Sequence, residues 1–240
     1  FLARMSLRPV EHAFSEQQRF VQDASHELKT PLTVILANLS ILKSRPAATI
    51  QEEMLWIQNT ETEARRMQEL TERLLFLAKA DSKRLSPKIE RLSLSQLTEA
   101  AALPFTALAF ERGLSLETKL EAELYVKGDA RALTQLLAIL IDNALKYAKS
   151  GSVVTVRLAR QKKQALLSVH NEGEVIPQDA LPHLFDRFYR VDKSRARAQG
   201  GYGLGLSIAK TIAHAHGGDI RVESSAEHGT CFTTTLPLSE

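Results

Sequence analysis

The sequence predicts an α+β protein: an N-terminal helical hairpin forming a dimeric four-helix bundle, then a two-layer α/β sandwich with a mixed sheet. All 11 glycines lie from Gly113 onward, and a seven-residue apolar repeat runs through the glycine-free beginning. Short apolar–polar alternations mark the remainder. The change falls at a polar stretch, 81–87, that ends in proline. We therefore expect one unit over 1–80, a linker over 81–90 and a second unit over 91–240.

The first helix is predicted over about 10–44, because apolar residues recur there at heptad spacing. The a series is Phe14, Val21, Leu28, Ile35 and Leu42, and the d series is Gln18, Ser25, Leu32 and Leu39. After a turn at Pro46, a second helix over about 49–80 carries Ile57, Ala64, Met67, Leu70, Leu74 and Leu77. One hairpin cannot bury both series, so we expect a homodimer. Packing of the hairpin on the second unit of the same chain is the alternative.

The second unit alternates between helix and strand patterns. Helices are expected over about 94–111, 129–149 and 203–216, and strands over 114–119, 124–127, 154–158, 165–169, 219–224 and 230–236. Adjacent βαβ units do not dominate this order. The order therefore favours a mixed sheet with helices on one face.

The composition of the chain limits the classes of function that it can have. The chain has 31 basic and 28 acidic residues, a balance that gives no argument for a nucleic-acid partner. The single cysteine, Cys231, excludes internal disulfides and a cysteine-based metal cluster. No apolar stretch reaches the roughly 18 residues that a membrane helix needs, and no leader peptide is visible. The chain begins at Phe1, and we expect it to be a piece of a longer protein.

Polar chemistry interrupts the first helix around His26. This residue follows a d position, which places it beside the apolar seam and toward solvent. A neutral imidazole nitrogen is a nucleophile near neutral pH, and the adjacent Glu27 can orient it or take its proton. Thr30 lies one turn further on the same face, and Pro31 should bend the helix there. On residue chemistry alone, an exposed helical histidine is more often an inert surface residue.

Two clusters in the second unit suit a nucleotide. Asn143, Lys146 and Tyr147 offer an oxygen for Mg²⁺, a charge for phosphate and a flat ring for a base. The glycines of 200–205 run straight into a helix, and glycine loops at helix N-termini favour phosphate. The cluster is neither a Walker A nor a Rossmann motif. An amphipathic helix with incidental polar residues is the alternative for the first cluster, and a flexible linker for the second.

The motif Ser25-His26-Glu27-Leu28-Lys29-Thr30-Pro31-Leu32 resembles the phosphoacceptor box of two-component sensor histidine kinases. The resemblance implies that His26 is phosphorylated from ATP and passes the group to an aspartate on a response regulator receiver domain. It further implies that Glu27 activates the histidine and that Thr30 acts in dephosphorylation of the regulator.

The second unit resembles the catalytic domain of the same kinases. The order Asn143-Ala-x-Lys-Tyr147, Phe185–Arg190, Gly201-x-Gly-Leu-Gly205 and Gly229-Thr230 is similar to that of GHKL-type ATPases with the Bergerat fold. The resemblance implies that Asn143 holds Mg²⁺ and that a lid over about 186–202 covers ATP. The nucleotide-contacting residues that it implies are Asn143, Lys146, Tyr147, Asn171, Gly173, Phe188, Arg190, Arg195, Gly201, Gly203, Leu204, Gly205, Leu206 and Thr230.

Three residues depart from the pattern of that family. Ile139 stands where it has an asparagine, Asn171 where it has an aspartate, and Val175 where it has a glycine. An amide can still accept a hydrogen bond from the adenine amino group, but its own NH₂ needs a partner. Losing a charge-assisted hydrogen bond costs about 1 kcal/mol, which weakens affinity several-fold.

Three hypotheses follow, in order of preference. The first is a sensor kinase core whose linker acts as a hinge between the phosphotransfer and catalytic units. The second is a nucleotide-impaired relative that acts mainly as a response-regulator phosphatase, and the third is a non-enzymatic adaptor that docks a receiver domain. The resemblance places the chain in the cytoplasmic portion of a bacterial inner-membrane protein, with membrane contact only through segments absent from this chain.

Overall fold

The computed structural model describes residues 2–82, 87–192 and 201–239, with the side chains of residues 2–13 and 16 left out of the description. The chain divides into two compact units, Phe1–Asp81 and Ser82–Glu240.

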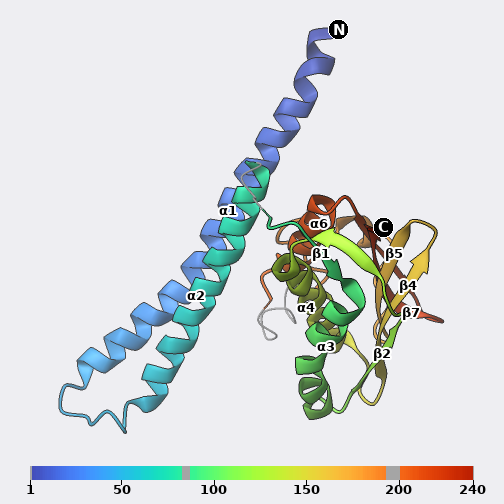
Figure 1. Ribbon diagram of the computed structural model, residues 1–240. Coiled ribbons are helices and arrows are strands. Elements are labelled where there is room, and N and C mark those ends of the chain that lie inside the picture. Colours follow the sequence, from blue (N-terminus) through green and yellow to red (C-terminus); the bar gives the residue numbers. More distant parts are fainter. Residues whose placement is uncertain (1, 83–86, 193–200, 240) are drawn as a thin grey trace. The chain divides into compact units, whose positions relative to one another are not determined.

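The first unit is an antiparallel pair of helices (Figure 1). Helix α1 spans Leu2–Ser44 and helix α2 spans Met54–Asp81. The least exposed residues at the start of α2 and along it recur three and four apart, which defines the face packed against α1. They are Glu53, Trp56, Thr60, Glu63, Met67, Leu70, Leu74 and Leu77, and Arg73, Phe76 and Ala80 beside them are half-buried as well. Ile57 and Ala64, which belong to the apolar series expected from the sequence, lie outside this face and are exposed.

The turn between the helices is longer than the sequence pattern predicted. Residues 50–53 form turns, so α2 begins at Met54 instead of about 49. The Thr49 N–H donates a hydrogen bond to Glu52 Oε2 at 2.7 Å, and Arg45 pairs with Glu53 across the turn at 3.3 Å. Such side-chain bonds give the backbone an alternative to the first helical turn. Helix α1 continues through Pro31 without interruption.

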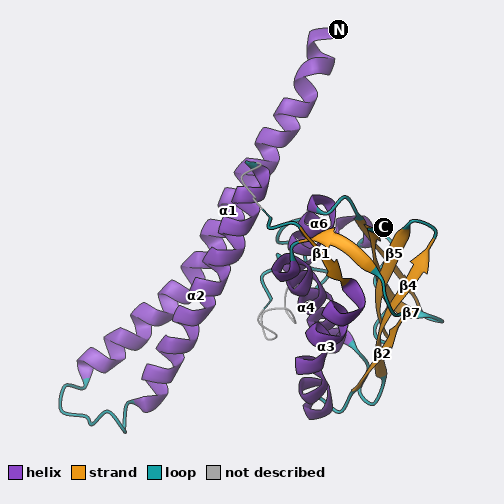
Figure 2. Ribbon diagram, viewed as in Figure 1, coloured by secondary structure: helices purple, strands orange, loops and turns teal. Residues whose placement is uncertain are grey.

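The second unit is a two-layer sandwich. Its five-stranded sheet has the order β2-β4-β5-β7-β6, with β2 parallel to β4 and every other pair antiparallel. Helices α3, α4 and α6 lie on one side of the sheet (Figures 1 and 2). The predicted α+β class, with a mixed sheet and helices on one face, is confirmed. The strands are β2 Ser115–Leu120, β4 Val153–Gln161, β5 Gln164–Asn171, β6 Asp219–Ser225 and β7 Gly229–Pro237, and the helices are α3 Leu94–Glu111, α4 Ala130–Tyr147 and α6 Gly205–Ala215.

The core lies between this sheet and the helices. Strand β5 alternates so that Ala165, Leu167, Val169 and Asn171 are buried. Apolar inward residues therefore line most of the strand, and a polar one stands at its end. Helix α4 supplies the largest buried helical face, made of Leu133, Leu136, Leu137, Leu140, Ile141, Ala144 and Leu145.

Two elements were not anticipated from the sequence. Strand β1, Glu90–Ser93, pairs antiparallel with β3, Tyr125–Gly128, and a single 3₁₀ turn covers Leu181–His183. The start of β1 falls on the last residue of the expected linker. Helix α6 begins two residues later than expected, since Gly203 takes a left-handed backbone with φ of 68°. Over the described part of the chain, every helix is too short or too polar to cross a bilayer.

Candidate phosphoacceptor and nucleotide sites

Helix α1 presents the candidate phosphoacceptor to solvent. His26 and Thr30 are both exposed, and Glu27 is half-buried. The Thr30 hydroxyl lies 3.5 Å from the carbonyl oxygen of His26, one turn back. A residue four positions on shares the same helix face, so Thr30 and His26 project from the same side of α1. The structure thus brings the three phosphotransfer residues predicted from the sequence onto neighbouring positions of one helix.

The last two turns of α4 carry the second cluster. Asn143 and Lys146 are half-buried, and Tyr147 is 54% exposed. The Lys146 ammonium lies 2.6 Å from a carboxylate oxygen of Asp142, a partner that the sequence reasoning missed. The i,i+4 spacing of an acid and a lysine on one helix was the available indication.

Tyr147, the last residue of α4, lies near Arg190 and Asp192 in the first part of the expected lid. Burial raises the pKa of Tyr147, the positive charge of Arg190 opposes this, and the carboxylates of Asp142 and Asp192 add to it. These charges act on the phenol because they lie close to it. Arg190 therefore lies near the end of α4, as expected of a residue that reaches a nucleotide held there.

A buried polar corner lies where β5 and β7 meet the end of α4. Asn171 is 3% exposed and is the cross-strand partner of Thr230, which is 5% exposed. The Thr230 hydroxyl is 2.8 Å from the Ser224 hydroxyl, and Ser224 accepts a hydrogen bond from the Ile176 N–H at 3.0 Å. Ser224 was not predicted, because its contact with Thr230 crosses from β6 to β7.

Gly173 closes this corner against α4. A Cβ on Gly173 would lie 2.1 Å from the Tyr147 carbonyl oxygen and 3.1 Å from the Asn171 amide nitrogen. Residues 173 and 148 form an isolated β-bridge, and the Lys149 N–H donates to the Glu172 carbonyl at 2.7 Å. Only glycine permits this approach, which holds the predicted residues Tyr147, Asn171 and Gly173 together.

Two residues with left-handed backbone conformation, one near each end of the expected lid, are joined by a hydrogen bond. Phe188 has φ of 61° and Gly203 has φ of 68°, and the Phe188 N–H donates to the Gly203 carbonyl at 2.9 Å. A non-glycine residue in this region is uncommon and accompanies functional loops. The predicted Arg195 and the segment 193–200 lie outside the described residues.

The glycine-rich segment 201–205 leads into the N-terminus of α6, which no side chain caps. Leu204 is fully buried at the N-cap of α6 and gives no side-chain cap, and Gly205 and Leu206 begin the helix. Backbone N–H groups at such an end suit phosphate oxygens. A Cβ on Gly205 would lie 3.3 Å from a methyl of Ile139, so this departure from the family pattern packs α4 against the start of α6. Gly201 has open space around it.

The donor set fits a nucleotide with Mg²⁺. The described residues hold no group of three or more His, Cys, Asp and Glu side chains placed to bind a metal. A magnesium ion that keeps several waters and uses substrate phosphates needs only one or two protein oxygens. The half-buried Asn143 oxygen would meet that need, and the uncapped start of α6 is suited to bind an anion.

Comparison with known proteins matches both units. The His Kinase A (phospho-acceptor) domain matches residues 16–83, and the Histidine kinase-, DNA gyrase B-, and HSP90-like ATPase family matches residues 128–240. Sensor histidine kinase YkoH of Bacillus subtilis is 41% identical over 229 residues, which cover 95% of this chain and 49% of that protein. Sensor histidine kinase CusS of Escherichia coli K12 is 37% identical over 228 residues, covering 95% of this chain and 47% of that protein.

Solved structures share the fold. Acinetobacter baumannii histidine kinase AdeS matches with a TM-score of 0.71 at 22% identity, covering 90% of this chain and 98% of that one. Mycobacterial sensor histidine kinase MprB matches with a TM-score of 0.55 at 26% identity, covering 62% of this chain and 97% of that one.

A phosphoacceptor helical hairpin joined to a Bergerat-type ATPase domain defines a histidine kinase core. The chain belongs to the two-component sensor histidine kinase family. It spans about half the length of the curated relatives that it matches.

Proposed function

We propose that this chain is the catalytic core of an ATP-dependent protein-histidine kinase, with His26 as the phosphoacceptor and an aspartate of a response regulator as the final acceptor. Residues 1–80 serve as the dimerisation and phosphotransfer domain, 81–90 as the linker and 91–240 as the ATP-binding domain. The observation that carries the proposal is an exposed histidine beside a glutamate, in a chain whose second unit offers an uncapped helix end for phosphate.

Each of the nucleotide-contacting residues suits a different part of the nucleotide. The N–H groups at Gly205 and Leu206 and the ammonium of Lys146 bind phosphate oxygens. Arg190 adds positive charge from the lid base, with Arg195 in the same role, and the Tyr147 ring lies against the base or sugar. Asn143 would hold Mg²⁺, which when bound neutralises charge on the phosphates.

The transfer itself is a displacement at phosphorus. An imidazole nitrogen of His26 forms a bond to the γ-phosphorus of ATP, and the bond to the bridging oxygen breaks, which releases ADP. Glu27 orients the ring and stabilises its positive charge. A receiver-domain carboxylate then takes the phosphoryl group from the imidazole. Thr30, on the same helix face, assists a water molecule when the regulator is dephosphorylated.

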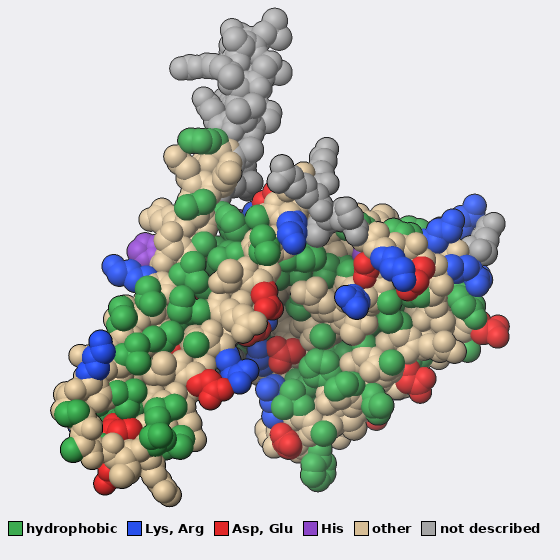
Figure 3. All heavy atoms as spheres, turned by 60° about the vertical axis from the view of Figure 1, so that its left-hand side comes forward, with side chains coloured by type: hydrophobic (Ala, Val, Ile, Leu, Met, Phe, Trp, Pro, Cys, Tyr) green, Lys and Arg blue, Asp and Glu red, His purple; other side chains and the backbone are tan. Residues whose placement is uncertain are grey.

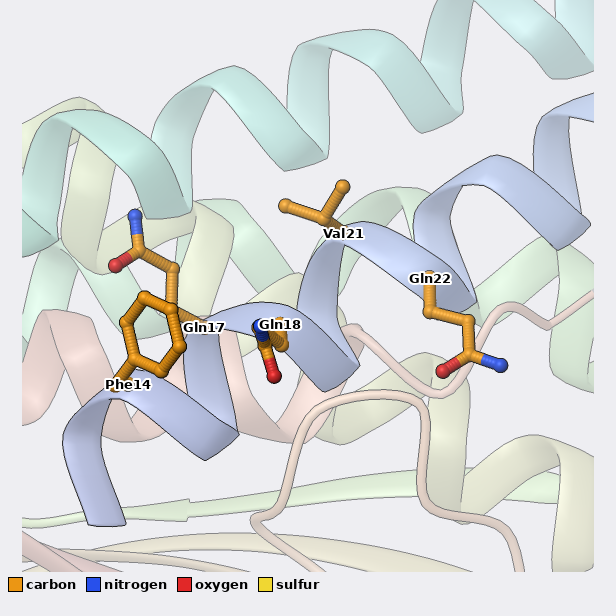
Figure 4. A pocket seen from close by; sticks show the side chains of 5 residues that line it. All are labelled: Phe14, Gln17, Gln18, Val21 and Gln22. Atoms are coloured by element: carbon orange, nitrogen blue, oxygen red, sulfur yellow. The ribbon is translucent and has the colours of Figure 1, made fainter. Parts of the chain in front are cut away.

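The hairpin supports assembly as a homodimer. Phe14 is 60%, Val21 57% and Leu36 59% exposed. Hydrophobic side chains gather over much of the visible face of the hairpin (Figure 3). Near the start of α1, Phe14, Gln17, Gln18, Val21 and Gln22 line a shallow hollow (Figure 4). A second hairpin would cover these surfaces in a four-helix bundle.

We place the longer protein to which this chain belongs in a bacterial inner membrane, with this chain on the cytoplasmic side.

Labelled ATP tests the proposal. The protein is incubated with γ-labelled ATP and Mg²⁺, and acid-labile protein label is measured for the wild type, His26→Gln and His228→Gln. His228 is an exposed histidine of the second unit and serves as the matched control. We expect label on the wild type and the control and none on His26→Gln. Acid-labile label that persists in His26→Gln would refute the assignment.

A second candidate function rests on Ile139, Asn171 and Val175. Ile139 places an apolar side chain against Gly205 where phosphate is expected, and Val175, which precedes the residue whose N–H bonds Ser224, is 44% exposed. Weak ATP binding would leave a response-regulator phosphatase that depends on Thr30. Millimolar nucleotide affinity, no label on His26, and regulator dephosphorylation lost in Thr30→Ala would favour it. Inertness toward both ATP and phosphorylated regulator would instead indicate a docking adaptor.

A further inference from the structure

Asn171 is largely buried, and the orientation of its amide is not fixed. The residue ends β5 on the helix-facing side of the sheet, with only 3% of its surface exposed. Its amide nitrogen lies over Gly173, 3.1 Å from where a Cβ on that glycine would stand. Within the described residues, the side-chain amide makes no hydrogen bond that would select one of its two orientations, and its atoms are not sealed from solvent. An amide in a largely buried residue that makes no such bond can take its hydrogen-bond partner from a bound ligand.

The hydroxyl of Thr230, the cross-strand partner of Asn171, can likewise either donate or accept a hydrogen bond. This hydroxyl and that of Ser224 lie 2.8 Å apart, and either can donate the proton. Ser224 already accepts the Ile176 N–H at 3.0 Å, so a rotation of the two hydroxyl protons reverses the polarity that Thr230 presents. The corner therefore combines an amide and a hydroxyl, and both can donate or accept.

This pair of groups matches the edges of two kinds of purine. A 6-aminopurine presents a donor at position 6 and an acceptor at N1, and a 6-oxopurine presents the reverse. A carboxylate accepts only, so it favours the amino group and repels the 6-oxo oxygen. An amide that turns by 180° serves either edge with two hydrogen bonds.

We propose that Asn171 is a specificity-determining residue that lets this site accept 6-oxopurine nucleoside triphosphates, such as ITP and GTP, as well as ATP. The inference rests on the proposed function, because it assumes that the base of the nucleotide lies in the corner of Asn171, Gly173 and Thr230. It concerns the substrate class of that site and is independent of the acceptor residue.

Calorimetric titration with Mg²⁺ and each nucleotide tests the proposal. ITP is the decisive probe, because it differs from ATP only at position 6 and the proton on N1. GTP adds the 2-amino group. The full chain is compared as wild type, Asn171→Asp and Asn171→Ser. Gln164→Glu makes the same amide-to-carboxylate change at the exposed far end of β5 and is the matched control.

We expect the wild type and Gln164→Glu to bind ATP and ITP with dissociation constants within about threefold of each other. Asn171→Asp should prefer ATP over ITP by about tenfold or more, since the carboxylate faces the 6-oxo oxygen. Asn171→Ser should weaken both nucleotides by a similar factor. Circular dichroism checks that each variant folds. If Asn171→Asp does not fold, the ratio of the wild-type dissociation constants for ATP and ITP tests the proposal by itself.

Two results would overturn the inference: a wild type that already prefers ATP over ITP by more than about tenfold, or a folded Asn171→Asp with an unchanged ratio. Failure of the proposed function is distinguishable. Equal binding of ATP and ITP without label on His26 from either leaves the base-pocket inference standing and removes the kinase assignment. The absence of binding by all three nucleotides removes both.

Discussion

Replacing Gly173 with alanine should destabilise the second unit, because the new side chain would meet backbone at the nucleotide corner. The new Cβ would lie 2.1 Å from the Tyr147 carbonyl oxygen, where real Cβ atoms keep beyond 3.0 Å. The two backbones must therefore separate by about 0.9 Å. The oxygen belongs to the rigid end of α4 and cannot rotate away, so the strain falls on the β-bridge between residues 148 and 173.

Forcing an extra carbon into a packed site costs about 1–3 kcal/mol, and contact with backbone places this change at the upper end. In a unit of this size, each kcal/mol lowers Tm by roughly 2–4 °C, so we expect a fall of about 5–10 °C. Differential scanning calorimetry of the full chain measures it. ATP affinity should fall with it, because Asn171 and Tyr147 both contact this glycine.

Gly201→Ala is the matched control for stability, since a Cβ there meets no atom within 4 Å. It should shift Tm by less than about 2 °C. If Gly173→Ala unfolds at the same temperature as Gly201→Ala, the close approach of β5 to α4 does not exist as described. The reasoning on the nucleotide corner would fail with it.

Three further predictions concern the cap of α4, the hairpin face and the ion pair beside the nucleotide site. Asp129→Ala removes the N-cap of α4 and should cost about 1 kcal/mol in urea unfolding at neutral pH. Backbone N–H donors hold the pKa of Asp129 below its usual value. The wild-type advantage should therefore exist above the unfolded pKa, near about 4, and vanish as pH falls through the lower folded value. Val21→Asp should raise the dimer dissociation constant about a hundredfold in sedimentation experiments, whereas Gln164→Asp, an exposed change in the second unit, should change it little. Asp142→Asn frees the ammonium of Lys146 and should lower KM for ATP about threefold; a raised KM would make Asp142 part of the binding site.

Local pattern sufficed for most of the fold. Helix α3 has the predicted bounds, because Ser93 caps it by accepting the Gln96 N–H and the apolar run ends at Glu111. Strands β4 and β5 followed from their alternation, since one face of each is buried. Strand β1 was missed because it has four residues and depends on pairing with β3, more than 30 residues away.

The candidate site divides in the same way. Contiguous motifs located His26 and the Asn143–Tyr147 segment, because helical spacing alone sets which of their side chains share a face. Contacts between distant segments were invisible to that reasoning. Ser224 meets Thr230 across two strands, and the Phe188 N–H meets the Gly203 carbonyl across the lid. Neither contact leaves a periodic trace in the sequence.

The ends of α4 and α6 away from the nucleotide site meet at one hydrogen-bonded junction. The Asp129 N–H donates to His216 Nε2 at 2.9 Å, and His216 Nδ1 lies 2.7 Å from the Ile212 carbonyl oxygen, so the ring joins the two helix ends. The Asp129 carboxylate caps α4 and also accepts the N–H of Lys88, at the end of the linker. Lys88 is thereby bonded to the N-cap residue of α4, and that residue is bonded to His216 at the end of α6; the opposite ends of these helices carry Asn143 and Gly205. We therefore expect Asp129→Ala, which removes the carboxylate's hydrogen bonds to Lys88 and to the start of α4, to change the nucleotide affinity as well as the stability of α4, and titration of the variant with ATP measures the first effect.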